Sequence, residues 1–124
     1  MNLLLVMTGG AIGAGARYLT GRVMFGAFGP AYPWGTLTVN ILGGMLMGLL
    51  VGTLARSAVA GEPWRLLLGV GVLGGFTTFS AFSLDAVSLY ERGAAAAALG
   101  YVLGSVVLSI LALGIGLAAV RSLA

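Results

Sequence analysis

The chain has 124 residues, of which 60% are hydrophobic and only 7% are charged, and its mean hydropathy is +1.11. A soluble domain of this size needs far more polar surface, so the composition indicates a single-domain integral membrane protein. The absence of cysteine and histidine excludes disulfides, thiol or imidazole catalysis and Cys/His metal sites, and the six arginines are too scattered for a nucleic-acid surface.

Four apolar stretches follow one another along the chain, separated by short segments that contain proline, glycine or charge. Each is about as long as a helix must be to cross a bilayer, and helices satisfy their own backbone hydrogen bonds in lipid. The sequence therefore predicts an all-α fold of four transmembrane helices, forming one domain over residues 1–124 in the cell inner membrane. The helices are expected at about Leu3–Phe25, Gly35–Leu54, Trp64–Tyr90 and Ala94–Val120, with loops at 26–34 and 55–63.

The first stretch contains Ala14-Gly15-Ala16, which resembles a signal-peptide cleavage site. No lysine or arginine precedes the apolar residues, so we expect the stretch to remain in the mature chain as a helix. Arg17 and Arg22 are expected near its end, and GAFGPAYPW at 26–34 predicts a turn.

Four helices place both termini on one side of the membrane, which allows the arginines to be counted by side. The positive-inside rule predicts orientation from an excess on one side, and here the count is equal. We therefore expect that the chain can insert in both orientations, and that a homodimer with an inverted second copy is possible. Arg56, Arg65 and Arg121 are assigned to the side of the termini, and Arg17, Arg22 and Arg92 to the other.

Glycines recur every fourth residue on three of the helices. Such faces let helix backbones approach closely in lipid, so most of these glycines are expected to serve packing, and they also favour self-association. The repeats are Gly9 and Gly13, then Gly44, Gly48 and Gly52, then Gly100 and Gly104.

Uncharged polar residues form stripes on the second, third and fourth helices. Polar groups within a membrane usually face a helix-bundle interior or a water-filled path, although a single serine or threonine often bonds back to its own helix. Asn40 is the hardest to explain as packing, because its amide needs several partners in a dry setting. The stripes are Thr36 with Asn40, then Thr77, Thr78, Ser80 and Ser83, then Tyr101, Ser105 and Ser109.

The third stretch contains GGFTTFSAFS at residues 74–83. Two glycines followed by two threonines are poor helix formers, and the stretch is longer than a membrane requires, so a break at mid-membrane is expected. Carbonyl groups freed by a break can bind a monovalent cation, for which a dimer axis is one position, and a simple packing kink is the alternative.

After this break, Phe79 and Phe82 are three residues apart and share a helix face. The edge of an aromatic ring is electropositive, so ring edges and hydroxyl or amide hydrogens can contact an anion without placing a full charge in its path. Neutral donors hold an anion weakly enough to release it, which is what conduction requires.

These residues resemble the Fluc or CrcB fluoride channels of bacteria over the whole chain. The motifs occur in family order: GGAIGAGARY on the first helix, GTLTVNILG on the second and GGFTTFSAFS on the third. The resemblance implies a dual-topology homodimer in the lipid bilayer, with two pores that pass fluoride passively out of the cell.

The resemblance also implies roles for individual residues. Phe79 and Phe82 would line the fluoride path with their ring edges, Asn40 would donate to fluoride, and Arg17 would lie at an aqueous vestibule. The backbone carbonyls of Gly74 and Thr77 would bind a structural sodium ion that is not transported. A polar path would be formed by Thr36, Ser80, Ser83, Tyr101, Ser105 and Ser109.

Two positions depart from the family pattern: Ala81 stands where threonine is common, and Asp85 where glutamate is usual. Conductance is expected to differ if the acid shapes the pore mouth, whereas selectivity should survive. The main alternative is a small multidrug-resistance transporter, but its first helix normally carries a carboxylate and no acid here precedes Glu62. A non-catalytic subunit of a larger complex is the third possibility, and an enzyme is not expected because bases and carboxylates are not grouped.

Overall fold

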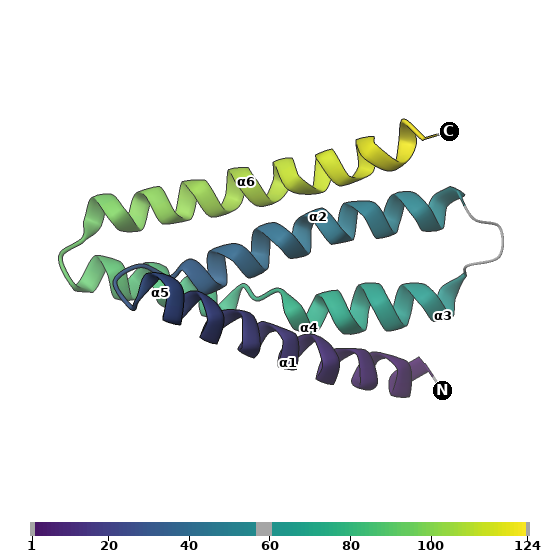
Figure 1. The fold of residues 1–124 in the computed structure, drawn as a ribbon, viewed down its shortest axis with the longest axis horizontal. Helices are drawn as coiled ribbons and strands as arrows, with labels where there is room; N and C mark the ends of the chain where they lie inside the picture. Colours follow the sequence, from purple (N-terminus) through teal and green to yellow (C-terminus); the bar gives the residue numbers. More distant parts are fainter. Residues whose placement is uncertain (1, 57–60, 124) are drawn as a thin grey trace.

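The computed structural model describes residues 2–56 and 61–123, and within these ranges the regular structure is helical. Four helical stretches are long and apolar enough to cross a membrane, which confirms the predicted number of spans. Part of the predicted loop at 55–63 lies outside the described residues. The helices are α1 (Asn2–Phe28), α2 (Trp34–Arg56), α3 (Glu62–Trp64), η1 (Arg65–Leu73), α4 (Gly74–Phe76), α5 (Ser80–Glu91) and α6 (Ala95–Arg121), as drawn in Figure 1.

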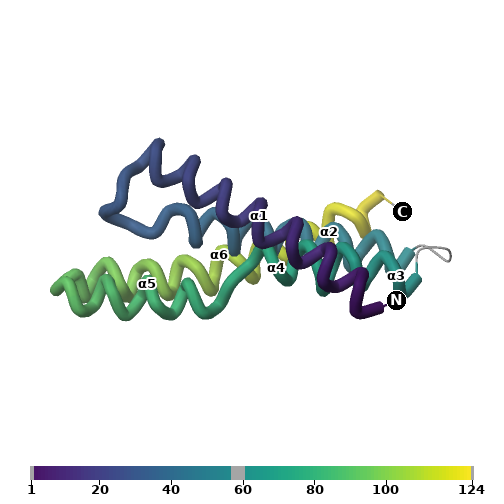
Figure 2. Tube along the Cα trace, turned by 90° about the horizontal axis from the view of Figure 1, so that it is seen from below, coloured from purple at the N-terminus to yellow at the C-terminus, as the bar shows by residue number. Residues whose placement is uncertain are grey.

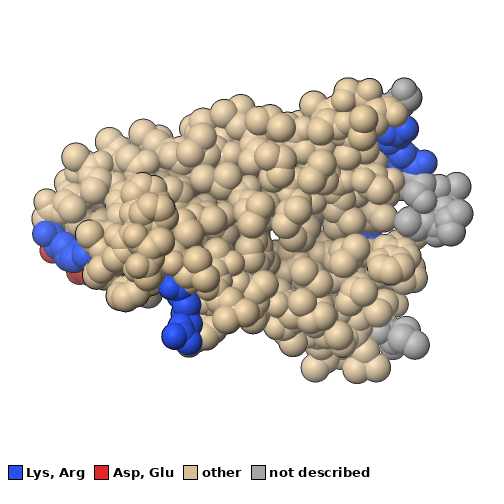
Figure 3. All heavy atoms as spheres, viewed as in Figure 1, with Lys and Arg blue, Asp and Glu red and all other residues tan. Residues whose placement is uncertain are grey.

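The four spans lie lengthwise beside one another, and the two ends of the chain lie at the same end of the bundle (Figure 1). α2 packs mainly on α6, and α1 packs mainly on η1 and α4. At the other end of the bundle the α1–α2 pair and the α5–α6 pair diverge, as Figure 2 shows. Most of the face in Figure 3 carries no charged atoms, as expected for a surface in contact with lipid.

Glycine backbones form the closest helix contacts, because a methyl group at these positions would overlap a neighbouring helix. A Cβ at Gly44 would lie 2.7 Å from the Ser109 carbonyl oxygen, and one at Gly48 would overlap the Leu113 carbonyl. Gly13 meets η1 and α4 in the same way. The expected packing role is therefore confirmed for α1 and α2, whereas a Cβ at Gly100 or Gly104 would meet no described atom within 4 Å.

The third span is not one continuous helix in the described residues. Its first half is largely the π-helix η1, α4 ends at Phe76, and Thr77 has an extended backbone with φ −79° and ψ 159°. The hydroxyl of Thr78 then accepts a hydrogen bond from the Ala81 N–H at 3.2 Å, which satisfies one N–H group in the first turn of α5. Residues 77–79 therefore interrupt the span between two separately terminated helices.

The far end of α5 closes in a glycine turn that fixes the place of Arg92. Gly93 has φ +84°, its N–H bonds to the Tyr90 carbonyl at 3.0 Å, and the Ala94 N–H bonds to the Leu89 carbonyl at 3.0 Å. This pattern is a Schellman motif, and the left-handed backbone at its centre favours glycine. Arg92 is the last residue before this glycine turn. Its side chain reaches the loop between α1 and α2, where it bonds the Ala31 carbonyl.

One sequence expectation requires correction. Arg17 was expected near the end of the first helix, but α1 continues to Phe28, so Arg17 lies about three turns inside it. Its Nε donates to the Gly75 carbonyl at 3.1 Å, which places it level with the interruption of the third span. The helix runs on because Val23 to Phe28 contains no proline, and Gly29, at φ +78°, ends it.

Candidate functional site

A cavity of about 350 Å³ lies beside the interruption and is lined by five of the residues expected to form the fluoride path. We call it the deep cavity. These residues are Asn40 on α2, Phe79 in the interruption, Phe82 on α5, and Ser105 and Ser109 on α6. The other residues that line it are Gly43, Gly44, Met47, Thr77, Thr78, Val106 and Leu113.

Asn40 joins α2 to the interrupted segment through a pair of hydrogen bonds. Its Nδ2 donates to the Thr78 carbonyl at 3.0 Å, and its Oδ1 accepts from the Thr78 N–H at 2.9 Å. Helix interruption leaves these two backbone groups without helical partners, so the side chain replaces the missing bonds. An amide nitrogen carries two hydrogens, and the second has no partner among the described residues, which leaves one donor at the edge of the cavity.

Ser105 and Ser109 supply the other hydroxyl donors of the deep cavity. Ser105 is buried, and neither side-chain oxygen has a hydrogen-bond partner within the described part of the chain. A buried hydroxyl without a hydrogen-bond partner lowers the stability of the fold, so packing alone does not explain a serine at these positions. Both hydroxyls can therefore donate to a guest in the cavity.

The two phenylalanines lie together but differ strongly in exposure. Their ring centroids are 5.5 Å apart with an interplanar angle of 46°. Phe82 is 8% exposed, whereas Phe79 is 77% exposed and projects from the surface of its own chain. A single chain therefore leaves the aromatic side of the deep cavity open.

Two hydroxyls of the expected path, those of Ser80 and Ser83, do not line the deep cavity, and the hydroxyl of Thr77, which does, is already bonded. The Ser83 hydroxyl donates to the Phe79 carbonyl and the Thr77 hydroxyl to the Leu73 carbonyl, both at 2.9 Å. These are bonds back to the residue four positions earlier, the alternative that the sequence left open. Ser80 is exposed, with its Oγ 3.5 Å from that of Thr78. A hydroxyl has one hydrogen, so Ser83 and Thr77 cannot donate to an anion in this arrangement.

Tyr101, from the expected path, does not line the deep cavity, but it packs against Phe82, which does. It is fully buried, its ring lies 5.2 Å from that of Phe82, and its hydroxyl donates to Asp85 Oδ2 at 3.1 Å. Tyr32 packs edge-on against Tyr101 from the other side, with centroids 5.6 Å apart. Aromatic rings thus continue from the interruption to the α1–α2 turn.

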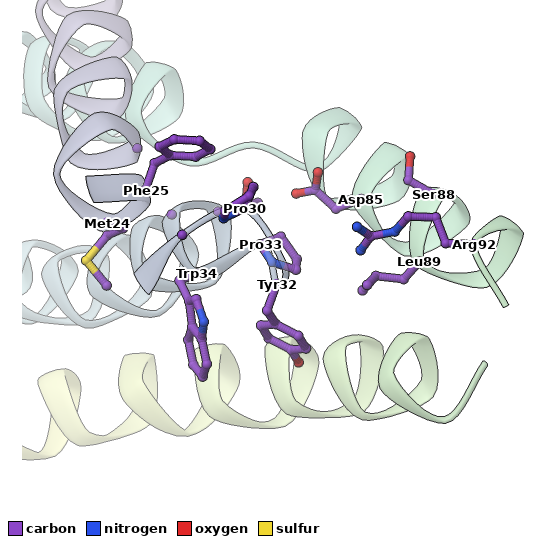
Figure 4. A pocket seen from close by; sticks show the side chains of 14 residues that line it. Met24, Phe25, Pro30, Tyr32, Pro33, Trp34, Asp85, Ser88, Leu89 and Arg92 are labelled. Atoms are coloured by element: carbon purple, nitrogen blue, oxygen red, sulfur yellow. The ribbon is translucent and has the colours of Figure 1, made fainter. Parts of the chain in front are cut away.

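The second cavity, which we call the mouth cavity, has a volume of about 400 Å³ and lies between the α1–α2 turn and α5 (Figure 4). Thr36, from the expected polar path, lines it with Asp85, Ser88 and Arg92. Arg92 Nη2 donates to the Ala31 carbonyl at 3.1 Å, which ties the turn to α5. The remaining residues that line it are Gly21, Met24, Phe25, Gly29, Pro30, Tyr32, Pro33, Trp34, Gly35 and Leu89.

Arg17 lies in a third hollow, of about 580 Å³, together with Tyr18 and Arg22. This hollow shares Gly21 and Phe25 with the mouth cavity and no residue with the deep cavity. The role of Arg17 as a vestibule residue stays a prediction, and the structure adds its bond to the Gly75 carbonyl.

The carbonyl groups of Gly74 and Thr77 are the expected cation ligands. Their helical partners bond elsewhere, since the Thr78 N–H goes to Asn40 and the Ala81 N–H to the Thr78 hydroxyl. Neither carbonyl accepts a hydrogen bond among the described residues. Free carbonyl oxygens suit a hard cation, and the described residues hold no group of acidic, histidine or cysteine ligands that would compete.

Sequence reasoning did not single out Thr78 as the partner of Asn40, or Arg92, Tyr32 and Ser88 at the mouth cavity. Arg92 followed by Gly93 does signal a helix end, but no sequence pattern says that the arginine reaches Ala31, because these residues are far apart in the chain.

Comparison with known proteins finds similar chains of nearly the same length. A family model described as CrcB-like protein, Camphor Resistance (CrcB), matches residues 4–117. A "Fluoride-specific ion channel FluC" from Sphingopyxis alaskensis is 55% identical over 122 residues, which cover 98% of this chain and 97% of that protein. A protein of the same name from Chelativorans sp. is 59% identical over 98% of both chains. Another, from Agrobacterium fabrum, is 56% identical over 99% of this chain and 98% of its own length.

Proposed function

This chain belongs to the CrcB-like family, and from that membership and the deep cavity we propose that it is a fluoride-selective channel of the cell membrane. It is a multi-pass membrane protein and not an enzyme. Fluoride is proposed to move passively down its own gradient, out of a cell that has accumulated it, because the deep cavity contains no titratable residue that could couple flow to protons.

The observation that carries this proposal is the donor set of the deep cavity. Among the described residues the hydroxyls of Ser105 and Ser109 and one amide hydrogen of Asn40 have no partner, and the rings of Phe79 and Phe82 are adjacent. All of these groups are neutral and can present a positive edge or hydrogen to an anion. They can replace part of its hydration shell without holding it as tightly as an arginine would.

We further propose that two copies assemble as an inverted homodimer with two pores. Gly74, Phe79 and Ser80 are exposed at the interruption, and unpaired backbone in this position cannot face lipid. A second copy would cover the interruption and enclose the Phe79 ring. With Arg17 inside α1, three arginines remain toward the end of the termini and two toward the other, which is still a weak orientation signal.

The interruption is also the proposed site of a structural sodium ion. Two carbonyl oxygens from each copy, those of Gly74 and Thr77, would be available to hold it. The ion would supply a positive charge that satisfies these oxygens and joins the two copies. Purified dimer is expected to unfold at a higher temperature in sodium than in a large organic cation, and equal unfolding temperatures would exclude this site.

A fluoride-electrode efflux assay on reconstituted protein tests the channel. Vesicles loaded with potassium fluoride should release fluoride when a potassium ionophore is added, and vesicles loaded with chloride should release almost none. Protein-containing vesicles as tight to fluoride as empty ones would reject the channel, and comparable chloride release would reject its selectivity.

The orientation is tested separately, and the absence of cysteine makes the experiment simple. A Ser122→Cys variant carries one thiol at the end of the bundle that holds the termini. A membrane-impermeant maleimide should label about half of it in intact cells if both orientations occur. Complete labelling or complete protection would show a single orientation.

A further inference from the structure

The mouth cavity and the deep cavity follow one another along two helices. On α2, Thr36 lines the first and Asn40 the second, and the two residues lie one turn apart on the same face. On α5, Asp85 lines the first and Phe82 the second in the same way. The mouth cavity therefore lies one helical turn from the deep cavity, toward the α1–α2 turn, and buried Tyr101 contacts Phe82 of the deep cavity and Asp85 of the mouth cavity.

Two of the side chains that line the mouth cavity carry opposite charges. Asp85 lies on α5 and Arg92 directly follows that helix, and both side chains point toward the α1–α2 turn in Figure 4. No ion pair joins them in the described residues, and the carboxylate of Asp85 instead accepts the Tyr101 hydroxyl. Arg92 uses Nη2 to bond the Ala31 carbonyl, and its other N–H groups have no partner in the described chain.

An anion that enters the deep cavity by this route must pass Asp85. A carboxylate near a narrow aqueous passage lowers the local concentration of anions, and a nearby guanidinium offsets that effect. Arg17 and Arg22 line a neighbouring hollow that meets the mouth cavity at Gly21 and Phe25, whereas Arg92 lines the mouth cavity together with Asp85.

We propose that Arg92 attracts fluoride into the mouth cavity by offsetting the charge of Asp85 and presenting its free N–H groups to the anion. This inference rests on the proposed fluoride channel and assigns its entry residue. Arg92 acts chiefly through charge, and its bond to Ala31 holds the guanidinium at the opening.

The test compares fluoride efflux from vesicles that contain the full-length wild-type protein or an Arg92→Gln variant, at low and high concentrations of an impermeant salt. At low ionic strength the variant should conduct about threefold to tenfold more slowly, and the difference should shrink at high ionic strength because salt screens the charge. Arg92→Lys should retain most of the flux. Arg121→Gln, which removes an equal charge at the last residue of α6, near the chain termini, should match the wild type.

A second variant separates charge from structure. Asp85→Asn in the Arg92→Gln background should recover most of the lost flux, because it removes the repulsion that Arg92 offsets and keeps an oxygen for Tyr101. A loss that is equal at all salt concentrations, or that Asp85→Asn does not relieve, would show that Arg92 acts only by holding Ala31 and would overturn the proposal. Failure of the wild type itself to pass fluoride would instead refute the proposed channel.

Discussion

The Asn40 side chain and the Thr78 backbone form two reciprocal hydrogen bonds, of 3.0 Å and 2.9 Å. One amide thereby replaces the two backbone bonds that the interrupted third span loses at this residue. The same amide keeps one hydrogen for the deep cavity. Asn40 is thus both a support of the interruption and a candidate ligand for the anion.

Replacement of Asn40 by alanine should affect flux and stability together. It leaves the Thr78 N–H and carbonyl unpaired, at a cost of about 1–3 kcal/mol in the free energy of unfolding. Fluoride efflux should fall by at least about tenfold, because a donor is lost and the interruption loosens. Thr38→Ala, on the same helix and outside the deep and mouth cavities, is the control, and wild-type efflux from Asn40→Ala vesicles would contradict the assignment.

Phe79→Ile and Phe82→Ile should each slow fluoride efflux strongly while the protein still assembles. Isoleucine fills a similar volume but has no electropositive ring edge to face the anion. The measurement is electrode efflux, with the elution volume in size-exclusion chromatography as the check on assembly. Phe28→Ile removes a ring from the end of α1 that lines neither the deep nor the mouth cavity, and it should conduct normally. Unchanged flux in both test variants would remove the rings from the path.

Ser105→Ala and Ser109→Ala should lower flux without lowering stability. Each removes a buried hydroxyl that has no partner in the described chain, so the free energy of unfolding should stay the same or rise. The double variant should be slower than either single one. Ser83→Ala should cost less, because that hydroxyl already donates to the Phe79 carbonyl. A larger loss in Ser83→Ala than in Ser105→Ala would mean that the hydroxyls are used differently in the conducting state.

Gly48→Ala should destabilise the bundle by about 1–3 kcal/mol, because the new methyl group overlaps the Leu113 carbonyl and pushes α2 away from α6. The thermal unfolding midpoint of purified protein measures the effect. Gly114→Ala is the matched control on α6, since a Cβ there meets no described atom within 4 Å. Equal midpoints for the two variants would show that the helices adjust without cost.

The sequence by itself determined the four spans and the common side of the termini, because apolar length needs no distant partner. It also predicted a break in the third span, from local backbone preference. It also identified Asn40, Phe79 and the serines of α6 as a group. Only the tertiary structure decided which of the polar groups remain available. Ser105 and Ser83 look alike in sequence, yet the Ser105 hydroxyl has no partner within residues 2–56 and 61–123, whereas the Ser83 hydroxyl donates to the Phe79 carbonyl. The depth of Arg17 and the reach of Arg92 to Ala31 were settled in the same way, because the partner of a polar side chain depends on helices that are far apart in the chain and close in space.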